Sequence, residues 1–202
     1  MYTKRQRQDK IILTDIDGVV LDWEFAFTQW METQGHDLQN KNSYYIDKAF
    51  DLSSGKAGRL VHTFNESAAI GFLPPLRDAQ YYIKKLHEKY QYRFIAITSL
   101  SLNPYAKKLR VKNLNKLFGS NVFREVICLD CGARKDRELA KFATEYPGAV
   151  WIEDKTLNAD LGIHFGLDAL LMSHGHNFRY NGKAKAVKNW EEVYHHIDRI
   201  HQ

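Results

Sequence analysis

Two aspartates and a glycine follow a short apolar run near the start of the 202-residue chain. Residues 11–14 predict a buried strand, and Asp15, Asp17 and Gly18 come directly after it. Side chains alternate along a strand, so the two carboxylates project from one side at its carboxyl end. Adjacent carboxylates repel each other unless a cation or a shared proton lies between them. The spacing therefore indicates a metal-assisted site, and the alternative is a pair of solvated aspartates at an ordinary Asp-Gly turn.

Polar residues also follow three later apolar runs. These residues are Thr98, Ser99, Lys135, Glu153 and Asp154. Parallel strands in open α/β sheets place their ligands at the carboxyl edge, so we expect these groups to meet there. Carboxylates hold hard cations such as Mg²⁺, whereas a hydroxyl and a lysine bind phosphate oxygens. The combination suits phosphoryl transfer through an aspartyl-phosphate. A solvated lysine at a helix start remains the alternative for Lys135.

The elements that must position these residues alternate between apolar strands and amphipathic helices. Strands are predicted over 11–14, 94–98, 126–129, 149–152 and 167–172. Right-handed crossovers then give an α/β fold, a doubly wound parallel sheet with helices on both faces.

The block between the first two strands has a different pattern. Residues 22–72 show helical periodicity and no strand pattern, and Pro74-Pro75 marks their end. We therefore expect a small helical cap over 22–72, inserted into an α/β core made of 11–21 and 73–202. Residues 1–10 are expected to be a basic tail.

Composition narrows the class of protein. Hydrophobic residues make up 44% and charged residues 26% of the chain, as in soluble globular proteins. No apolar stretch is long enough to span a bilayer and no signal-peptide core follows the first residues, so we expect a cytoplasmic protein without membrane contact. The net charge of +5 attracts phosphorylated ligands in general and does not single out nucleic acid.

The cysteines and a histidine pair are weaker candidates for chemistry. Cys128 and Cys131 form one C-x-x-C without the second pair that a zinc site needs, so two reduced cysteines in or near the core are expected. His174 and His176 follow the last predicted strand and are interpreted as loop residues rather than ligands.

The motifs together resemble the haloacid dehalogenase superfamily of phosphohydrolases, from residue 11 to about 172. The stretch 14–20 resembles its first motif, and Ile97-Thr98-Ser99 resembles the second. Lys135 corresponds to the lysine of the third motif, and Glu153-Asp154 is similar to the acidic fourth motif. The position of the helical insertion is that of a cap in this superfamily.

The resemblance implies a Mg²⁺-dependent phosphomonoesterase with two chemical steps. Asp15 would be the nucleophile and Asp17 the general acid and base, while Thr98 and Lys135 would bind the phosphoryl group. The metal would be held by Asp15, by Asp154 and by the backbone carbonyl of Asp17. Glu153 is a further candidate ligand, and the sequence does not decide between it and Asp154 alone.

Within the superfamily, the chain is most similar to the 5′(3′)-deoxyribonucleotidases of phages and bacteria. Asp22-Trp23 and the stretch 71–75 support this likeness, whereas Lys155 departs from it by replacing an arginine. The resemblance implies a nucleotide substrate whose base stacks on an aromatic residue. Candidate substrate-binding residues are Gly18, Trp23, Phe27, Tyr44 and Ser99.

Alternatives remain open at this stage. Trp23 and Phe27 could equally form a helix face packed inside the cap, and Tyr44 could cover the cap's own core. The substrate could be a sugar phosphate or the phosphorylated end of a nucleic acid. A binding protein that kept the fold without catalysis is the third hypothesis. The sequence leaves the oligomeric state open.

Overall fold

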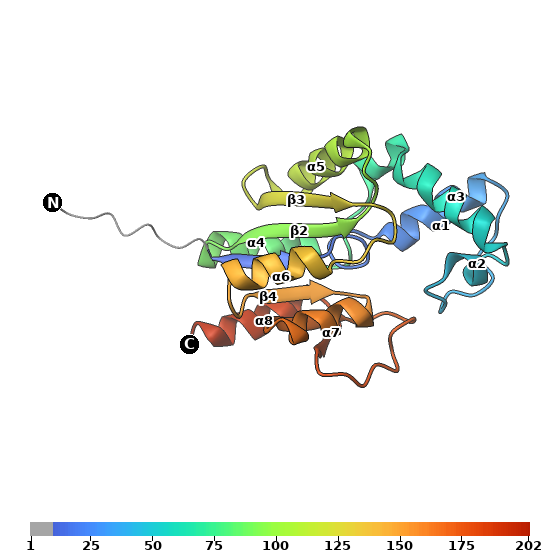
Figure 1. The fold of residues 1–202 in the computed structure, drawn as a ribbon. Coiled ribbons are helices and arrows are strands. Elements are labelled where there is room, and N and C mark those ends of the chain that lie inside the picture. Colours follow the sequence, from blue (N-terminus) through green and yellow to red (C-terminus); the bar gives the residue numbers. More distant parts are fainter. Residues whose placement is uncertain (1–9) are drawn as a thin grey trace.

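The computed structural model describes residues 10–202 and contains a six-stranded, all-parallel sheet with the strand order β3-β2-β1-β4-β5-β6 (Figure 1). The strands are β1 (Ile11–Thr14), β2 (Arg93–Ser99), β3 (Phe123–Leu129), β4 (Val150–Glu153), β5 (Asp168–Met172) and β6 (Lys185–Val187). β1 lies between β2 and β4, so the strand that immediately precedes Asp15 is central in the sheet. Its four residues are all buried, as expected for a strand covered on both faces.

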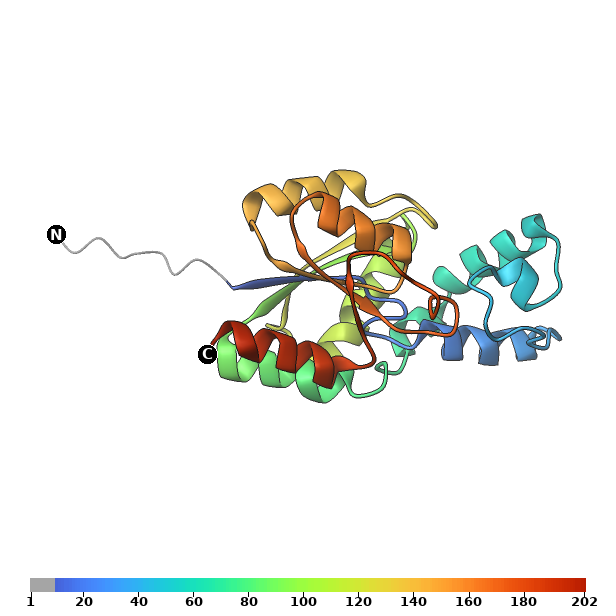
Figure 2. The same cartoon turned by 90° about the horizontal axis from the view of Figure 1, so that it is seen from below.

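Successive side chains of the strands belong alternately to two separate hydrophobic cores, one on each face of the sheet. Ile12 belongs to the core on one face and Leu13 to the core on the other, because neighbouring strand residues point in opposite directions. The first face is covered by α4 (Ala79–Tyr90), α5 (Pro104–Phe118) and α8 (Trp190–Ile200). The second face is covered by α6 (Asp136–Glu145) and α7 (Thr156–His164) (Figure 2). The predicted doubly wound α/β fold is confirmed.

Residues 22–72 contain no strand and form a helical insertion beyond the carboxyl ends of the strands (Figure 1). Its elements are α1 (Trp23–Thr33), α2 (Ile46–Ala49), α3 (Ser54–Asn65) and the 3₁₀ helix η1 (Ala68–Phe72). The side chains of Asp22 and Ser53 cap α1 and α3, each accepting a hydrogen bond from a backbone N–H of the first turn. Aromatic rings around Phe27 and Phe64 fill the interior of the insertion.

Asn65 joins this insertion to the sheet. Its buried side chain accepts a hydrogen bond from Trp23 Nε1 at 2.9 Å through Oδ1. Its Nδ2 donates to the carbonyl of Leu100, which follows β2, at 3.0 Å. One amide therefore ties α1 and α3 to the loop at the carboxyl edge.

The five predicted strands are all present, but the sequence interpretation missed β6. This strand has only three residues, and two of them are exposed at the edge of the sheet, so it lacks a readable apolar run. The expectation for the cysteines was partly wrong. Both are free, but Cys131 is exposed because it lies in the loop after β3.

The basic residues Lys4, Arg5 and Arg7 of the expected tail lie outside the described residues, whereas Lys10 is described and exposed. None of the helices in residues 10–202 combines the length and the apolar character that a membrane span requires.

Replacing two helical glycines by alanine should have opposite effects on stability. A Cβ at Gly162 in α7 would overlap Cδ1 of the buried Trp151, and it would lie 3.3 Å from Ala169 Cβ. Gly162→Ala should therefore lower the free energy of unfolding by about 1–3 kcal/mol. Gly58 in α3 has nothing within 4 Å of such a Cβ. Gly58→Ala should raise the stability by up to about 1 kcal/mol through helix propensity. Urea denaturation of both variants checks the pair, and equal effects would contradict the packing described for α7.

Candidate active site

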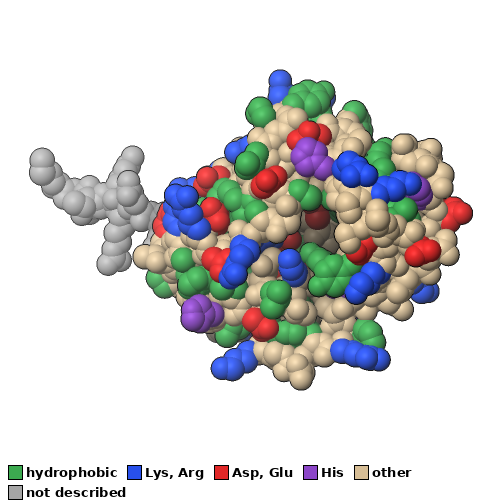
Figure 3. Space-filling view, turned by 45° about the vertical axis from the view of Figure 1, so that its right-hand side comes forward, with side chains coloured by type: hydrophobic (Ala, Val, Ile, Leu, Met, Phe, Trp, Pro, Cys, Tyr) green, Lys and Arg blue, Asp and Glu red, His purple; other side chains and the backbone are tan. Residues whose placement is uncertain are grey.

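A cavity of about 270 Å³ lies between the carboxyl edge of the sheet and the helical insertion. Figure 3 shows the hollow on the surface, with acidic side chains inside it. Its volume is close to the lower end of the about 300–1,000 Å³ typical of small-molecule sites. All the site residues predicted from the sequence line it. They are Asp15, Asp17, Gly18, Trp23, Phe27, Tyr44, Thr98, Ser99, Lys135, Glu153 and Asp154.

Lys135 is the centre of the charged part of the site. Its side chain is 2% exposed, and Nζ lies 2.8 Å from Asp15 Oδ2 and 2.8 Å from Glu153 Oε2. Lys135 immediately precedes α6, so the helix after β3 brings the ammonium group between the ends of β1 and β4. The alternative of a solvated helix-start lysine is therefore excluded by its burial.

Glu153 is bound by donors at both oxygens. Oε2 accepts from Lys135 Nζ and from Asn158 Nδ2, the latter at 3.1 Å. Oε1 accepts the backbone N–H groups of Asp154 at 3.2 Å and Lys155 at 3.1 Å. The residue is fully buried. This environment suits a carboxylate that fixes Lys135 and the loop after β4, rather than one that is free to bind a ligand.

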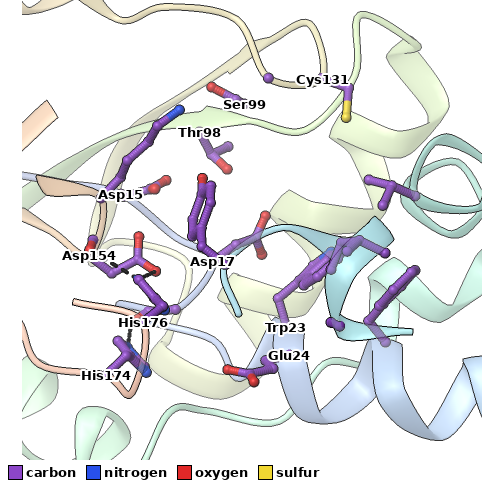
Figure 4. Close-up of a pocket in the computed structure, with 18 of the residues that line it drawn as sticks. Asp15, Asp17, Trp23, Glu24, Thr98, Ser99, Cys131, Asp154, His174 and His176 are labelled. Atoms are coloured by element: carbon purple, nitrogen blue, oxygen red, sulfur yellow. Dashed lines mark hydrogen bonds and ion pairs between the residues drawn. The ribbon is translucent and has the colours of Figure 1, made fainter. Parts of the chain in front are cut away.

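Asp154 and Asp15 lie next to each other on the floor of the cavity (Figure 4). Carboxylate oxygens of Asp15, Glu153 and Asp154 all lie within 4.8 Å of one another. Gly18 leaves room for this approach, because a Cβ there would lie 2.5 Å from Asp154 Oδ2, and its φ of +75° favours glycine. The turn after β1 is thus fitted to the carboxylate of the neighbouring strand.

The buried charges do not balance. Three carboxylates lie together, but the ammonium group of Lys135 pairs with only two of them, Asp15 and Glu153. Burial, together with the neighbouring carboxylate charges, raises the pKa of Asp15 to about 7 and that of Asp154 to about 7. An excess of negative charge on hard oxygen atoms is the donor set that a divalent cation such as Mg²⁺ prefers. The residues present therefore fit such an ion, with Asp15 and Asp154 as the carboxylates that are least occupied by other donors.

Two hydroxyls at the end of β2 differ in their partners. Thr98 Oγ1 is buried and has no hydrogen-bond partner in the described part of the chain. A buried hydroxyl that lines a cavity without a partner is suited to donate to a ligand oxygen. Ser99 Oγ instead donates to the carbonyl of Ala133 at 2.9 Å and so holds the loop that leads to Lys135.

Asp17 makes a contact that the sequence interpretation missed. Arg110 of α5 donates to both of its carboxylate oxygens, with Nη1 2.5 Å from Oδ1 and Nη2 3.1 Å from Oδ2. Asp17 is not among the side chains whose oxygens gather around Asp15. A sequence signal for Arg110 existed, because it shares the buried helix face of Ala106 and Leu114.

His174 and His176 lie in the loop after β5, as the sequence predicts. Both also line the cavity, which the sequence did not indicate. His174 Nε2 lies 2.6 Å from the Gly18 carbonyl, an acceptor only, so this nitrogen carries the proton. Burial lowers the pKa of His174 to about 4, which keeps the ring neutral. The loop after β5 folds back over β1, and the sequence pattern did not indicate this return.

The walls formed by the insertion are aromatic. The Trp23 ring stacks on Phe27 at 4.4 Å between centroids, and Phe27 is 1% exposed. Phe27 therefore belongs mainly to the interior of the insertion and supports Trp23 from behind. Tyr44 is 44% exposed. The centre of its ring lies 5.1 Å from the centre of the His176 ring and 5.6 Å from Lys155 Nζ. It thus spans from the insertion to the loops of the core.

Comparison with solved structures identifies proteins that share this fold. A haloacid dehalogenase-like hydrolase from Streptococcus pneumoniae aligns with a TM-score of 0.65 and 14% identity, covering 94% of this chain and 99% of its own. The D,D-heptose 1,7-bisphosphate phosphatase of B. bronchiseptica, complexed with magnesium and phosphate, gives 0.58 and 13%, covering 95% and 99%. The chain has the haloacid dehalogenase fold.

Sequence comparison gives a phage relative. An uncharacterised 32.4 kDa protein from the Gp30–rIII intergenic region of Enterobacteria phage T4 is 29% identical over 191 residues. The match covers 90% of this chain and 67% of the relative. No family model matches the sequence.

The raised pKa values predict how stability responds to pH and cation. A carboxyl whose folded pKa lies above its ordinary value stabilises the fold below that ordinary value, and this contribution is lost as pH rises through about 7. The cation-free protein should therefore lose stability between about pH 5 and pH 8, and Mg²⁺ should raise its melting temperature more at about pH 8 than at about pH 5.

Thermal melts with Mg²⁺ or with a chelator at both pH values check this. Asp154→Asn should remove most of the Mg²⁺ effect, whereas the exposed Asp37→Asn should keep it. A cation effect that is the same at both pH values, or that survives Asp154→Asn, would contradict the assignment of the ion to these carboxylates.

Proposed function

We propose that the protein is a Mg²⁺-dependent phosphomonoesterase that works through an aspartyl-phosphate. The observation that supports this best is the arrangement around Asp15. This carboxylate is paired with Lys135. It lies in the cavity with Asp154, and the unpartnered hydroxyl of Thr98 lines the same space (Figure 4). The group offers a nucleophile, a cation site and two donors for phosphate oxygens within one buried pocket.

In the proposed reaction, Asp15 attacks phosphorus in line and forms an acyl phosphate while the bond to the leaving oxygen breaks. Lys135 and Thr98 bind the phosphoryl oxygens and hold the phosphoryl group against the nucleophile. Asp17 gives a proton to the leaving oxygen and then takes one from the water that hydrolyses the acyl phosphate. A bound divalent cation held by Asp15 and Asp154 would neutralise charge on the transferred group.

Glu153 has a supporting role in this proposal. It fixes Lys135 and the backbone before Asp154, so that the two groups stay directed at Asp15. We assign the metal to Asp154 and not to Glu153, because four donors already occupy the oxygens of Glu153.

We further propose that the substrate is a nucleoside monophosphate and that the helical insertion is its cap. The insertion contributes Trp23 and Tyr44 to the cavity wall, and both are aromatic and partly exposed. Such rings suit a flat base, and stacking on a base contributes about 1–3 kcal/mol. Sugar phosphates and phosphorylated nucleic-acid ends share the same phosphate chemistry and are separated by the substrate screen below.

The proposed role of Asp15 as nucleophile predicts that its replacement by asparagine abolishes activity. The wild type should release phosphate from nucleoside monophosphates and from para-nitrophenyl phosphate, and only with Mg²⁺ present. Asp15→Asn removes the attacking oxygen and should abolish turnover, which a phosphate-release assay measures. Asp37→Asn, an exposed aspartate of the insertion, should behave as the wild type.

A screen that includes sugar phosphates and phosphorylated oligonucleotides gives the substrate class. Turnover at the wild-type rate in Asp15→Asn would refute the nucleophile. Absence of activity on every phosphate ester would favour a binding protein with this fold.

The proposed base contact predicts an effect confined to nucleotides. Trp23→Ala should raise KM for a nucleoside monophosphate about tenfold, in line with the loss of a stacked ring. It should leave KM for para-nitrophenyl phosphate much less affected.

Trp30→Ala is the matched control, because Trp30 belongs to the same helix and aromatic cluster but does not line the cavity. Similar effects of both variants on both substrates would show that Trp23 acts through folding of the insertion.

A further inference from the structure

Arg110 is a fully buried charge outside the residues that line the cavity. Its side chain is 0% exposed, and it is not part of the cavity wall, whereas its partner Asp17 is. Both terminal nitrogens donate to Asp17, and Nε has no partner in the described part of the chain. Arg110 therefore cannot touch a substrate in this arrangement, and whatever it does at the site passes through Asp17.

The contact fixes the direction of the Asp17 carboxylate. A guanidinium group that binds both oxygens of a carboxylate sets its plane as well as its position, which a single ammonium contact does not do. Asp17 follows Ile16 in the turn after β1, and its oxygens are not gathered with those of Asp15, Glu153 and Asp154. The side chain is thus held apart from the acidic cluster at a defined angle.

Arg110 belongs to α5, and contacts on both sides of Arg110 fix the position of this helix. The Asn103 side chain caps α5 by accepting from the N–H of Tyr105 at 2.9 Å. Asn113, three residues beyond Arg110, donates to the carbonyl of Leu73 at 3.0 Å. Leu109 packs against Gly71 of η1. A helix fastened on both sides of Arg110 gives the guanidinium group a fixed base.

We propose that Arg110 is a positioning residue for proton transfer by Asp17. This inference rests on the proposed phosphatase function and adds a residue to it. By holding the plane of the carboxylate, Arg110 directs one oxygen toward the leaving group as the phosphorus–oxygen bond breaks and toward the water in the second step. Asp17 begins the reaction protonated on a lone pair that Arg110 leaves free, because each carboxylate oxygen has two. That proton passes to the leaving oxygen as the phosphorus–oxygen bond breaks, and Asp17 regains a proton from the water that attacks the acyl phosphate.

The test compares two leaving groups. A nitrophenolate leaves without help, whereas the alkoxide of glycerol phosphate needs the proton from Asp17. The ratio kcat/KM reports only the formation of the aspartyl-phosphate, so it isolates this step. Arg110→Lys keeps the charge but loses the bidentate contact. It should lower kcat/KM for glycerol phosphate about 10²-fold, the scale of a misplaced catalytic group. The loss for para-nitrophenyl phosphate should be far smaller.

A second variant separates positioning from folding. Asp17→Asn alone should remove the about 10²–10⁴-fold contribution of the acid. Adding Arg110→Lys to Asp17→Asn should cause little further loss, because the group it directs is already inactive. Arg110→Met combined with Asp17→Asn avoids an unpaired buried charge and should show the same activity as Asp17→Asn alone.

Leu114→Val is the matched control, because Leu114 is buried on the same helix and is not among the partners of Asp17. It should affect both substrates equally and add to Asp17→Asn. If Arg110→Lys also lowers kcat/KM equally for both substrates and adds to the loss in Asp17→Asn, the positioning role is wrong while the phosphatase function stands. A wild type that hydrolyses neither substrate would overturn both.

Discussion

The ion pair between Lys135 and the carboxylates of Asp15 and Glu153 is the interaction on which the site depends. It brings together the ends of β1 and β4 and the start of α6, three elements that are distant in the sequence. A buried ammonium group is costly unless it is paired, and each of these carboxylates is equally costly without it. The three groups therefore stabilise one another only in the assembled fold, so correct packing of the sheet and formation of the charged site occur together.

The two parts of the chain divide the work at the cavity. The core supplies nearly all the charged groups, since Asp15, Lys135 and Asp154 follow strands or precede a helix of the sheet. The helical insertion supplies aromatic walls, which include the partly exposed Trp23 and Tyr44. Chemistry is thus placed on the rigid elements, and the contacts that could select a substrate are placed on the segment that lies above them.

The sequence predicted the sheet and the acidic floor of the site because both leave local patterns. Apolar runs mark buried strands, and polar residues at their ends mark the carboxyl edge. Arg110, His174 and His176 reach the site through tertiary packing instead. Arg110 sits in the apolar stripe of α5, and the histidines lie on a loop whose return over β1 has no sequence period. The three-residue β6 is too short to show alternation.

Asn65 gives the cavity an all-or-none character. The indole of Trp23 and the Leu100 carbonyl share its amide, so the aromatic wall and the loop after β2 keep their spacing only while both bonds exist. Trp23 and Asn65 both belong to the insertion, so rotating the insertion would leave their bond intact and would stretch and then break the bond to the Leu100 carbonyl. Solvent access to the acidic floor would then change in a single jump between two discrete geometries rather than by gradual breathing.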